Sequence, residues 1–289
     1  MWIIVLRRQT PRFDKECLET MVKYCPNLKE LKMREFGLLA DDWLPEIAKL
    51  KQLELLDLSA PGTSSLTDEP VIALLKEIGA ELDVLNLEDH IRLTDRVLLE
   101  GIVLHCHQVR RLILANVADY TPPQEDEQYE KSGLTNDGVA KFFTEWKASG
   151  HEGLFEANFS MCHDLKEEAL NAMISHSGAT IENLNVKGWK TVSEDSLTEI
   201  GRKCPNLKDL NVGWCRLLTD FSMKEILEGC DKLERVKAWG QLSRQQAWFR
   251  KLFTDDAVTS LSGCNKLTDN VPRKKGCKVT GIEAHAIGL

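Results

Sequence analysis

The sequence lacks the motifs that mark the common enzyme families and the long apolar runs that mark membrane spans. No segment approaches 18 consecutive apolar residues, the length at which a helix can cross a bilayer. The phosphate-binding patterns G-x-G-x-x-G and G-x-x-x-x-G-K-[ST] are missing, as are H-E-x-x-H and G-x-S-x-G. We therefore expect no membrane span, no catalytic residue, no cofactor and no bound metal, and we do not expect an enzyme.

The marks of a secreted protein are missing as well. The opening MWIIVLRRQ has only five apolar residues after Met1 and no cleavage-site pattern, so we expect no secretory signal. None of the nine cysteines forms a C-x-x-C pair, which favours free, buried thiols in a reducing compartment. The glycosylation sequon at Asn158 is then a chance match, because glycosylation requires the secretory route.

The chain also lacks a global basic charge. Its 289 residues carry a formal net charge of −8, so no overall field draws it to nucleic acid or to anionic membranes. Residues 241–289 differ, since they hold eight Lys and Arg against four Asp and Glu. The 43% of hydrophobic residues suffices for the core of one large domain or two ordinary ones.

What the sequence does contain is an internal repeat. The unit L-x-x-L-x-L, with other apolar residues allowed at its three positions, recurs at separations of 25, 29, 27, 45, 27, 26 and 26 residues. A repeat of about this length and pattern is typical of leucine-rich-repeat proteins. The copies begin at Leu28, Leu53, Leu82, Val109, Leu154, Ile181, Leu207 and Leu233.

Other residue types recur at fixed distances from the unit. A cysteine stands three residues before it in four repeats, and we interpret these cysteines as small buried hydrophobes. A Thr-Asp or Ser-Glu pair follows it, and Ser or Thr ahead of an apolar-periodic run predicts a helix N-cap. We therefore predict helices over 195–204 and 220–230, each with one apolar face. Those faces carry Leu197, Ile200 and Cys204, and Met223, Ile226 and Cys230.

These columns predict the fold class. One strand, one turn and one helix fill a repeat, and a single repeat cannot bury its apolar face alone, so repeats stack. We predict an α/β protein, a single leucine-rich-repeat domain over residues 1–289. It would form a horseshoe-shaped solenoid with about eight parallel strands on the concave side and helices on the convex side. Ile3 and Leu6, 25 residues before Leu28 and Leu31, fit an additional strand.

Two stretches interrupt the repeat. Residues 119–133 are acidic, contain proline and show no apolar periodicity, so we expect a disordered surface loop between a strand and a helix. A docking peptide is the alternative interpretation of this segment. Without residues 241–263, Cys264 and Leu267 would fall in their repeat columns, so we interpret 241–263 as a second insertion and 264–289 as a C-terminal cap.

The end of the chain carries a resemblance to a known family. The segments KAWG (237–240), CNKLTDN (264–270) and PRKKGCKVTGIEAH (272–285) resemble the leucine-rich-repeat subunit of fungal global-genome nucleotide-excision repair, the Rad-seven family. The cysteine-containing repeat over 12–289 is also similar to that of F-box substrate receptors. The family's N-terminal arm, with its adaptor-binding box and cysteine-rich metal motif, is not found here. We therefore expect the chain to be the C-terminal part of a longer parent.

The resemblance implies a non-catalytic recognition or scaffold subunit in nucleotide-excision repair of damaged DNA, in the nucleus and linked to a cullin-type ubiquitin ligase. It implies a Swi/Snf-type repair ATPase and elongin and cullin subunits as protein partners, with indirect DNA contact. The alternative is an F-box-type leucine-rich-repeat receptor that selects substrates for ubiquitin-dependent degradation. A third hypothesis is direct DNA binding through Arg273, Lys274 and Lys275. The competing role for these cations is a solvated cap on the last strand.

The concave face is the surface on which we expect recognition. Residues two and four places after the first apolar residue of each unit should face it. They are mixed polar residues with some exposed aliphatic ones, which suits protein recognition better than a phosphate backbone. The alternative role of the asparagines on neighbouring strands is to support the sheet, and the alternative position of the two tryptophans is in the core. The candidate partner-binding residues are Arg111, Asn185, Asn211, Trp214, Arg235, Lys237 and Trp239.

The densest set of potential metal ligands is His105-Cys106-His107. It falls at an expected helix end, where neighbouring side chains point to different sides. We therefore predict no zinc site there.

Overall fold

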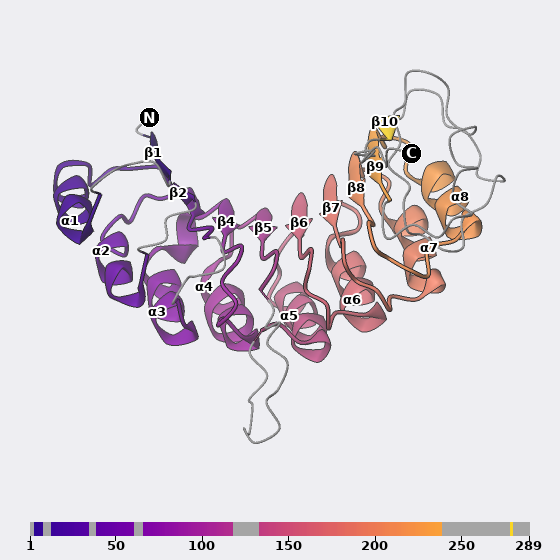
Figure 1. Cartoon of the computed structure of the whole chain (residues 1–289), viewed down its shortest axis with the longest axis horizontal. Helices are drawn as coiled ribbons and strands as arrows, with labels where there is room; N and C mark the ends of the chain where they lie inside the picture. The colour runs from indigo at the N-terminus through magenta and orange to yellow at the C-terminus, as the bar shows by residue number, and fades with distance from the viewer. Residues whose placement is uncertain are drawn as a thin grey trace, which may run out of the picture.

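The protein is a curved solenoid with strands on its inner side and helices on its outer side (Figure 1). The structure, a computed structural model, describes residues 3–7, 13–34, 39–60, 66–117, 133–238 and 278–279. In these segments ten strands form one sheet in the order of the chain, and every neighbouring pair is parallel. The predicted leucine-rich-repeat solenoid is confirmed.

The strands are short and share one register. The central residue of each three-residue strand from β3 to β9 is buried, and in β5 to β9 both flanking residues are at least partly exposed. In β3 and β4 the last residues, Asp57 and Asn86, are buried as well. The strands are β1 (Ile3–Arg7), β2 (Glu30–Arg34), β3 (Leu55–Asp57), β4 (Val84–Asn86), β5 (Arg111–Ile113), β6 (Glu156–Asn158), β7 (Asn183–Asn185), β8 (Asp209–Asn211), β9 (Arg235–Lys237) and β10 (Lys278–Val279).

The helices cover the convex side. A 3-10 helix, Asp41–Trp43, leads into α2, and a π-helix, Val97–Ile102, leads into α4. A second 3-10 helix, Gly79–Glu81, ends the third helix. The α-helices are α1 (Lys15–Tyr24), α2 (Leu44–Ile47), α3 (Asp68–Ile78), α4 (Val103–His105), α5 (Asn136–Ala148), α6 (Glu167–Ser177), α7 (Glu194–Lys203) and α8 (Asp220–Gly229). Each of these described helices is too short or too polar to span a bilayer.

One continuous apolar core runs between the sheet and the helices. The leucines of the repeat unit are its largest component, and Leu31, Leu56 and Leu112 are fully buried. The two predicted inward faces are confirmed, because all six of their residues are buried in α7, in α8 or at the helix ends. Two larger aromatic side chains, Trp146 and Trp189, fill the core where the repeats carry less leucine.

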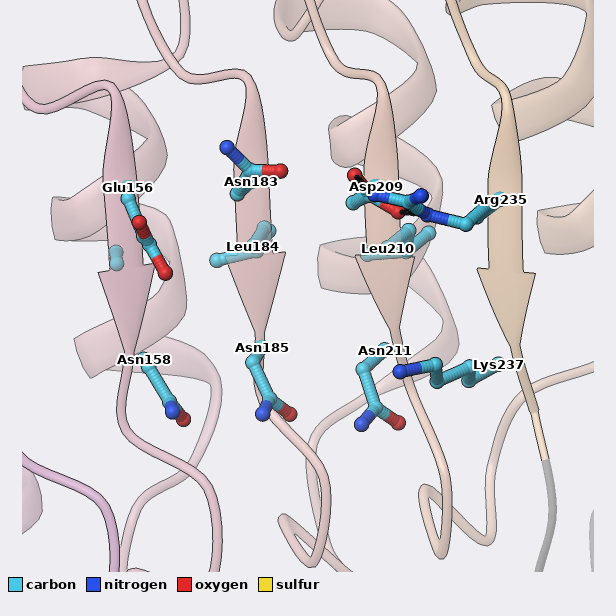
Figure 2. A pocket seen from close by; sticks show the side chains of 11 residues that line it. Glu156, Asn158, Asn183, Leu184, Asn185, Asp209, Leu210, Asn211, Arg235 and Lys237 are labelled. Atoms are coloured by element: carbon cyan, nitrogen blue, oxygen red, sulfur yellow. Dashed lines mark hydrogen bonds and ion pairs between the residues drawn. The ribbon is translucent and has the colours of Figure 1, made fainter.

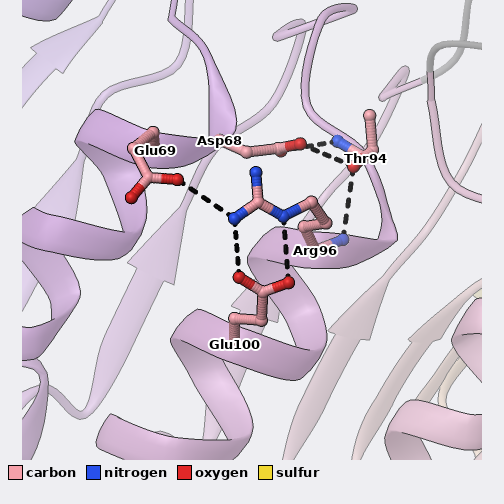
Figure 3. A network of polar contacts seen from close by, with 5 residues as sticks. All are labelled: Asp68, Glu69, Thr94, Arg96 and Glu100. Carbon is pink, nitrogen blue, oxygen red and sulfur yellow. Dashed lines mark hydrogen bonds and ion pairs between the residues drawn. The ribbon is translucent and has the colours of Figure 1, made fainter.

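The Thr-Asp column links each repeat to the next. The hydroxyl of Thr135 caps its own helix by accepting from Gly138 N at 3.0 Å, as predicted, and Thr219 caps its helix in the same way. The aspartate has a role that the sequence did not reveal. Asp68 accepts from both the backbone N–H and the hydroxyl of Thr94, one repeat later, at 2.8 and 2.6 Å (Figure 3). Asp41 binds Thr67, and Asp95 binds Thr135, with the same geometry.

The cysteine columns lie in the core. All seven described cysteines are free, and Cys106, Cys162 and Cys204 are completely buried. Burial raises the pKa of each of these three thiols to about 12, so they remain protonated and unreactive at neutral pH. Cys25 belongs to the cysteine column predicted to be buried but is only half-buried, and Cys17, outside the column, is exposed.

The sheet has one more strand at each end than the eight repeat units predict. The additional strand predicted from Ile3 and Leu6 is present as β1, and β10 pairs with β9 at Lys278 and Val279. The described part of the chain therefore contains ten strands, where about eight were predicted. The acidic segment joins β5 to α5 in the chain, and only its last residue, Gly133, is described. The predicted insertion 241–263 and, except for β10, the predicted cap 264–289 lie outside the described residues.

Candidate protein-recognition surface on the concave face

Two rows of side chains cross the concave face, because alternate residues of each strand point away from the core. The rows run perpendicular to the strands and are about 6.6 Å apart, the length of two strand residues. The first row from β2 to β9 is Glu30, Leu55, Val84, Arg111, Glu156, Asn183, Asp209 and Arg235. The second row is Lys32, Asp57, Asn86, Ile113, Asn158, Asn185, Asn211 and Lys237.

The asparagines of the second row form a ladder with a defined orientation. The Oδ1 atoms of Asn158, Asn185 and Asn211 accept hydrogen bonds from the backbone N–H two residues later, at 3.1, 3.2 and 3.1 Å. A backbone N–H can only donate, so the oxygen must face it and the Nδ2 group must face the concave space. The ladder therefore supports the strand ends, as one interpretation of the sequence expected. It also presents a row of N–H donors.

The C-terminal half of the face contains a hollow of about 250 Å³ that these asparagines line (Figure 2). Arg235 on β9 forms an ion pair with Asp209 on β8, so both charges are neutralised within the surface. Lys237 extends across the second row toward Asn211 (Figure 2). Burial raises the pKa of Glu156, opposite them on β6. Hence this hollow combines a donor row and a cation with one half-buried carboxyl group.

The N-terminal half contains a second hollow of about 570 Å³ with a different chemistry. Leu55 and Val84 are half-buried on its floor. Its polar residues are mainly acidic and partly paired, for example Asp83 with Arg110 at 2.5 Å. The polar residues are Glu30, Glu54, Glu81, Asp83, Gln108, Arg110, Arg111 and Glu152.

The structure therefore divides the predicted site residues between two hollows. Asn185, Asn211, Arg235 and Lys237 line the C-terminal one, whereas Arg111 lines the N-terminal one. The sequence-based selection omitted four polar residues that line the C-terminal hollow too, namely Glu156, Asn158, Asn183 and Asp209. For Asp209 a signal existed, because it stands in the column of Arg235 one repeat earlier, which places opposite charges on neighbouring strands. Trp239 lies outside the described residues.

Trp214 lies in the turn that follows β8, at the edge of the concave face. It is half-buried, and its backbone is in the left-handed region with a φ of 66°. Such a conformation is unusual for a bulky residue and costs about 1 kcal/mol or more. Trp214 is thus neither fully exposed nor fully buried. The corresponding residues of the four preceding repeats share the positive φ and are Asp89, Asn116, Met161 and Gly188.

His105, Cys106 and His107 follow one another at the end of α4. Cys106 is completely buried, His107 is exposed and His105 is half-buried, so the three side chains point to different sides. Within the described segments no three His, Cys, Asp or Glu side chains gather as ligands for a metal ion.

A cluster that the sequence did not reveal joins α5, the following loop and α6. The rings of His151 and His176 stack on Trp146, and the ring nitrogens of the two histidines are 3.3 Å apart. His151 Nε2 must be protonated, because it donates to the carbonyl of Val109 at 2.7 Å, and its Nδ1 accepts from Gly153 N at 3.1 Å. His151 is therefore neutral. Burial, with the proximity of His151, lowers the pKa of His176 to about 4.

With this geometry established, comparisons with known proteins show what the chain is similar to. It is 28% identical over 232 residues to the DNA repair protein rhp7 of Schizosaccharomyces pombe, and 24% identical over 235 residues to the DNA repair protein RAD7 of Saccharomyces cerevisiae. The chain is homologous to these Rad7 and Rhp7 repair proteins. Each match covers 80% of this chain and 38% or 39% of the relative, so the chain spans less than half of their length.

A solved structure has a similar fold. One chain of the crystal structure of the Rad7 and Elc1 complex from yeast matches with a TM-score of 0.66 and 18% sequence identity. The match covers 95% of this chain and 66% of that chain. At this identity the likeness shows the fold alone, over almost the whole length of this chain. No family model matches the chain.

Proposed function

We propose that this chain is the leucine-rich-repeat part of a non-catalytic recognition and scaffold subunit in nucleotide-excision repair. The observation that carries the proposal is the homology to two DNA repair proteins over 80% of the chain. The concave face supports a recognition role, since it holds two open hollows with exposed polar and aliphatic side chains and no gathering of nucleophile, base and metal ligands in the described segments. Such a subunit acts in the nucleus.

The partners we propose are proteins. The structural relative was crystallised in a complex with Elc1, which supports a link to an elongin and cullin ubiquitin ligase. A Swi/Snf-type repair ATPase is the second proposed partner, on the resemblance of residues 237–240, 264–270 and 272–285 to the Rad-seven family. Contact with DNA is indirect in this proposal, since the face carries carboxylates beside its cations and the chain has a net charge of −8.

The F-box-type receptor remains the second candidate, because the buried cysteines in the described repeats are the feature that this class shares with the chain. Affinity purification of the protein, tagged at its own locus, separates the two functions. The repair subunit predicts co-purification of a repair ATPase and an elongin-type adaptor, and it predicts ultraviolet sensitivity when the gene is deleted. Recovery of an F-box adaptor without repair proteins, together with normal ultraviolet survival, would contradict it.

A further inference from the structure

We propose that the C-terminal hollow of the concave face binds an acidic, extended segment of a partner protein. Its carbonyl and carboxylate oxygens would lie along the row formed by Asn158, Asn185, Asn211 and Lys237. This inference deepens the proposed function, because it rests on the concave face being a protein-recognition surface. To the proposed function it adds the chemical class of the partner segment and the residues that bind it.

The donor row is organised before any partner arrives. Each of the three asparagine oxygens is engaged by the backbone of its own repeat, so each amide nitrogen is held toward the hollow. The parallel register places Asn158 beside Asn185 and Asn185 beside Asn211. No other hydrogen bond of these three side chains occurs among the described residues. A partner that supplies acceptors therefore gains hydrogen bonds without having to break existing ones.

Positive charge lies at the end of the donor row. Lys237 is exposed and has no ion pair with any described residue, in contrast to Arg235, which is neutralised by Asp209. Lys187, two residues after Asn185, is close enough to Lys237 that burial and the neighbouring charge together lower its pKa. A carboxylate placed beside Lys237 would receive a charge-assisted hydrogen bond. The free charge of the second row therefore favours an anionic ligand.

The shape of the row favours an extended peptide over other anions. Strands in a sheet are about 4.8 Å apart, so the four side chains from β6 to β9 span about 15 Å. An extended chain advances about 3.3 Å per residue, so four or five peptide residues match that length.

A binding measurement on the purified chain tests this inference. The probe is a fluorescein-labelled peptide of alternating aspartate and serine, and the comparison ligands are a lysine and serine peptide of equal length and single-stranded oligothymidylate. Fluorescence anisotropy at low and at physiological salt should show preferential binding of the aspartate peptide. In the double variant Asn185→Asp, Asn211→Asp its affinity should fall by about tenfold or more, because two donors become charged acceptors.

The double variant should fold, because an aspartate already occupies the equivalent position of another repeat. In the same row, the Asp57 carboxylate already accepts the backbone N–H of Ser59 at 3.1 Å, so an aspartate can make the turn that each asparagine makes. Lys237→Gln, at an exposed position, provides an independent loss of affinity of several-fold. Lys32→Gln is the matched control, because Lys32 stands in the same row on β2, outside the hollow. It should bind like the wild type.

The outcomes separate this inference from the proposed function. No preference for the aspartate peptide, or affinity unchanged in both the double variant and Lys237→Gln, would overturn the inference. The repair function would stand if repair proteins still co-purified from cells. Tight, salt-dependent binding of oligothymidylate that these variants abolish would instead identify the hollow as a nucleic-acid site.

Discussion

At the scale of single residues, the described repeats are stabilised by leucines that occupy equivalent buried positions. Leu210 is the central residue of β8, is 2% exposed and also forms part of the floor of the C-terminal hollow. Its neighbours in register, Leu184 and Val236, are equally buried. Such a side chain contributes to stability through burial, and its loss leaves a cavity that a stacked sheet cannot easily close.

We therefore expect Leu210→Ala to lower the free energy of unfolding by roughly 2–5 kcal/mol. Urea denaturation followed by circular dichroism measures this change. Cys204→Ala, which also removes a fully buried side chain but a smaller one, should cost less. Equal stability of Leu210→Ala and wild type would contradict the assignment of Leu210 to the core.

The buried histidines predict how stability depends on pH. His90 and His176 each have a pKa lowered to about 4 by burial, against about 6.5 in the unfolded chain. Between these values the unfolded state binds more protons than the folded state. The stability is therefore fully present above pH 6.5 and decreases as the pH falls toward 4.

Lowering the pH from 7 to 5 should thus cost about 1–2 kcal/mol for each of these two histidines. Replacing His176 by Asn removes one of the two contributions. The difference in unfolding free energy between wild type and His176→Asn, measured in urea, should become smaller at pH 5 than at pH 7. A constant difference at the two pH values would show that His176 is not held neutral in the folded protein.

At the scale of helices and strands, adjacent repeats are joined by directed contacts as well as by the apolar core. The Asp68 carboxylate accepts two hydrogen bonds from Thr94 of the next repeat, and Arg96 nearby pairs with Glu69 and Glu100 (Figure 3). The arginine pairs are exposed and contribute little, whereas Asp68 is partly buried at the start of α3.

Asp68→Ala should therefore lower the free energy of unfolding by about 1–3 kcal/mol, because it leaves the N–H and hydroxyl of Thr94 without their acceptor. The control is Asp42→Ala, which removes an exposed carboxylate whose pair with Lys15 should contribute less than about 1 kcal/mol. Thermal unfolding of the two variants compares them directly. A larger loss from Asp42→Ala would contradict the proposed importance of the link between repeats.

The packing of α7 on α8 depends on the absence of a side chain. A Cβ atom on Gly201 would collide with the backbone carbonyl of Glu225 in α8. In a helix interior glycine is normally about 1 kcal/mol less favourable than alanine, so propensity alone predicts that Gly201→Ala stabilises the protein.

We expect the opposite sign, a loss of about 1–3 kcal/mol, because the two helices would have to separate. Thr144→Ala, at an exposed interior position of α5, provides the comparison in which helix propensity should decide and stability should not fall by more than a few tenths. Chemical denaturation of both variants measures whether each substitution raises or lowers the free energy of unfolding. A stabilising effect of Gly201→Ala would show that the helices are less closely packed.

At the scale of the whole molecule, the sequence predicts the solenoid because every repeat obeys the same local rules. The spacing of Leu207, Leu210 and Val212 specifies one strand, and the equivalent spacing in the other repeats specifies the register of the sheet. The helix starts at Thr135, Ser193 and Thr219 also follow from local chemistry, since a hydroxyl accepts the first free N–H groups.

What the sequence could not predict depends on contacts between distant residues. The Asp68–Thr94 link and the stacking of His151, His176 and Trp146 join residues that are about a repeat apart or belong to different elements. The positive φ of Trp214 is not predictable either, because tryptophan is unusual in that conformation. The candidate site was partly predictable, because the alternation of side chains along a strand identifies the residues that face the concave side. The sequence does not show that Arg111 lies in a different hollow from Asn185, Asn211, Arg235 and Lys237, because that depends on the shape of the folded surface.

The central claim is that the concave face of this chain recognises a protein partner within a repair assembly. The most direct test is quantitative affinity purification from cells that carry, at the native locus, either wild type or the variant Asn185→Asp, Asn211→Asp, Lys237→Gln. Lys141→Gln on the convex helix α5 controls for the loss of a surface cation. We expect wild type and control to recover the same repair proteins, and the concave-face variant to recover at least one of them about tenfold less at equal abundance. Undiminished recovery of every partner by the folded variant would contradict the claim.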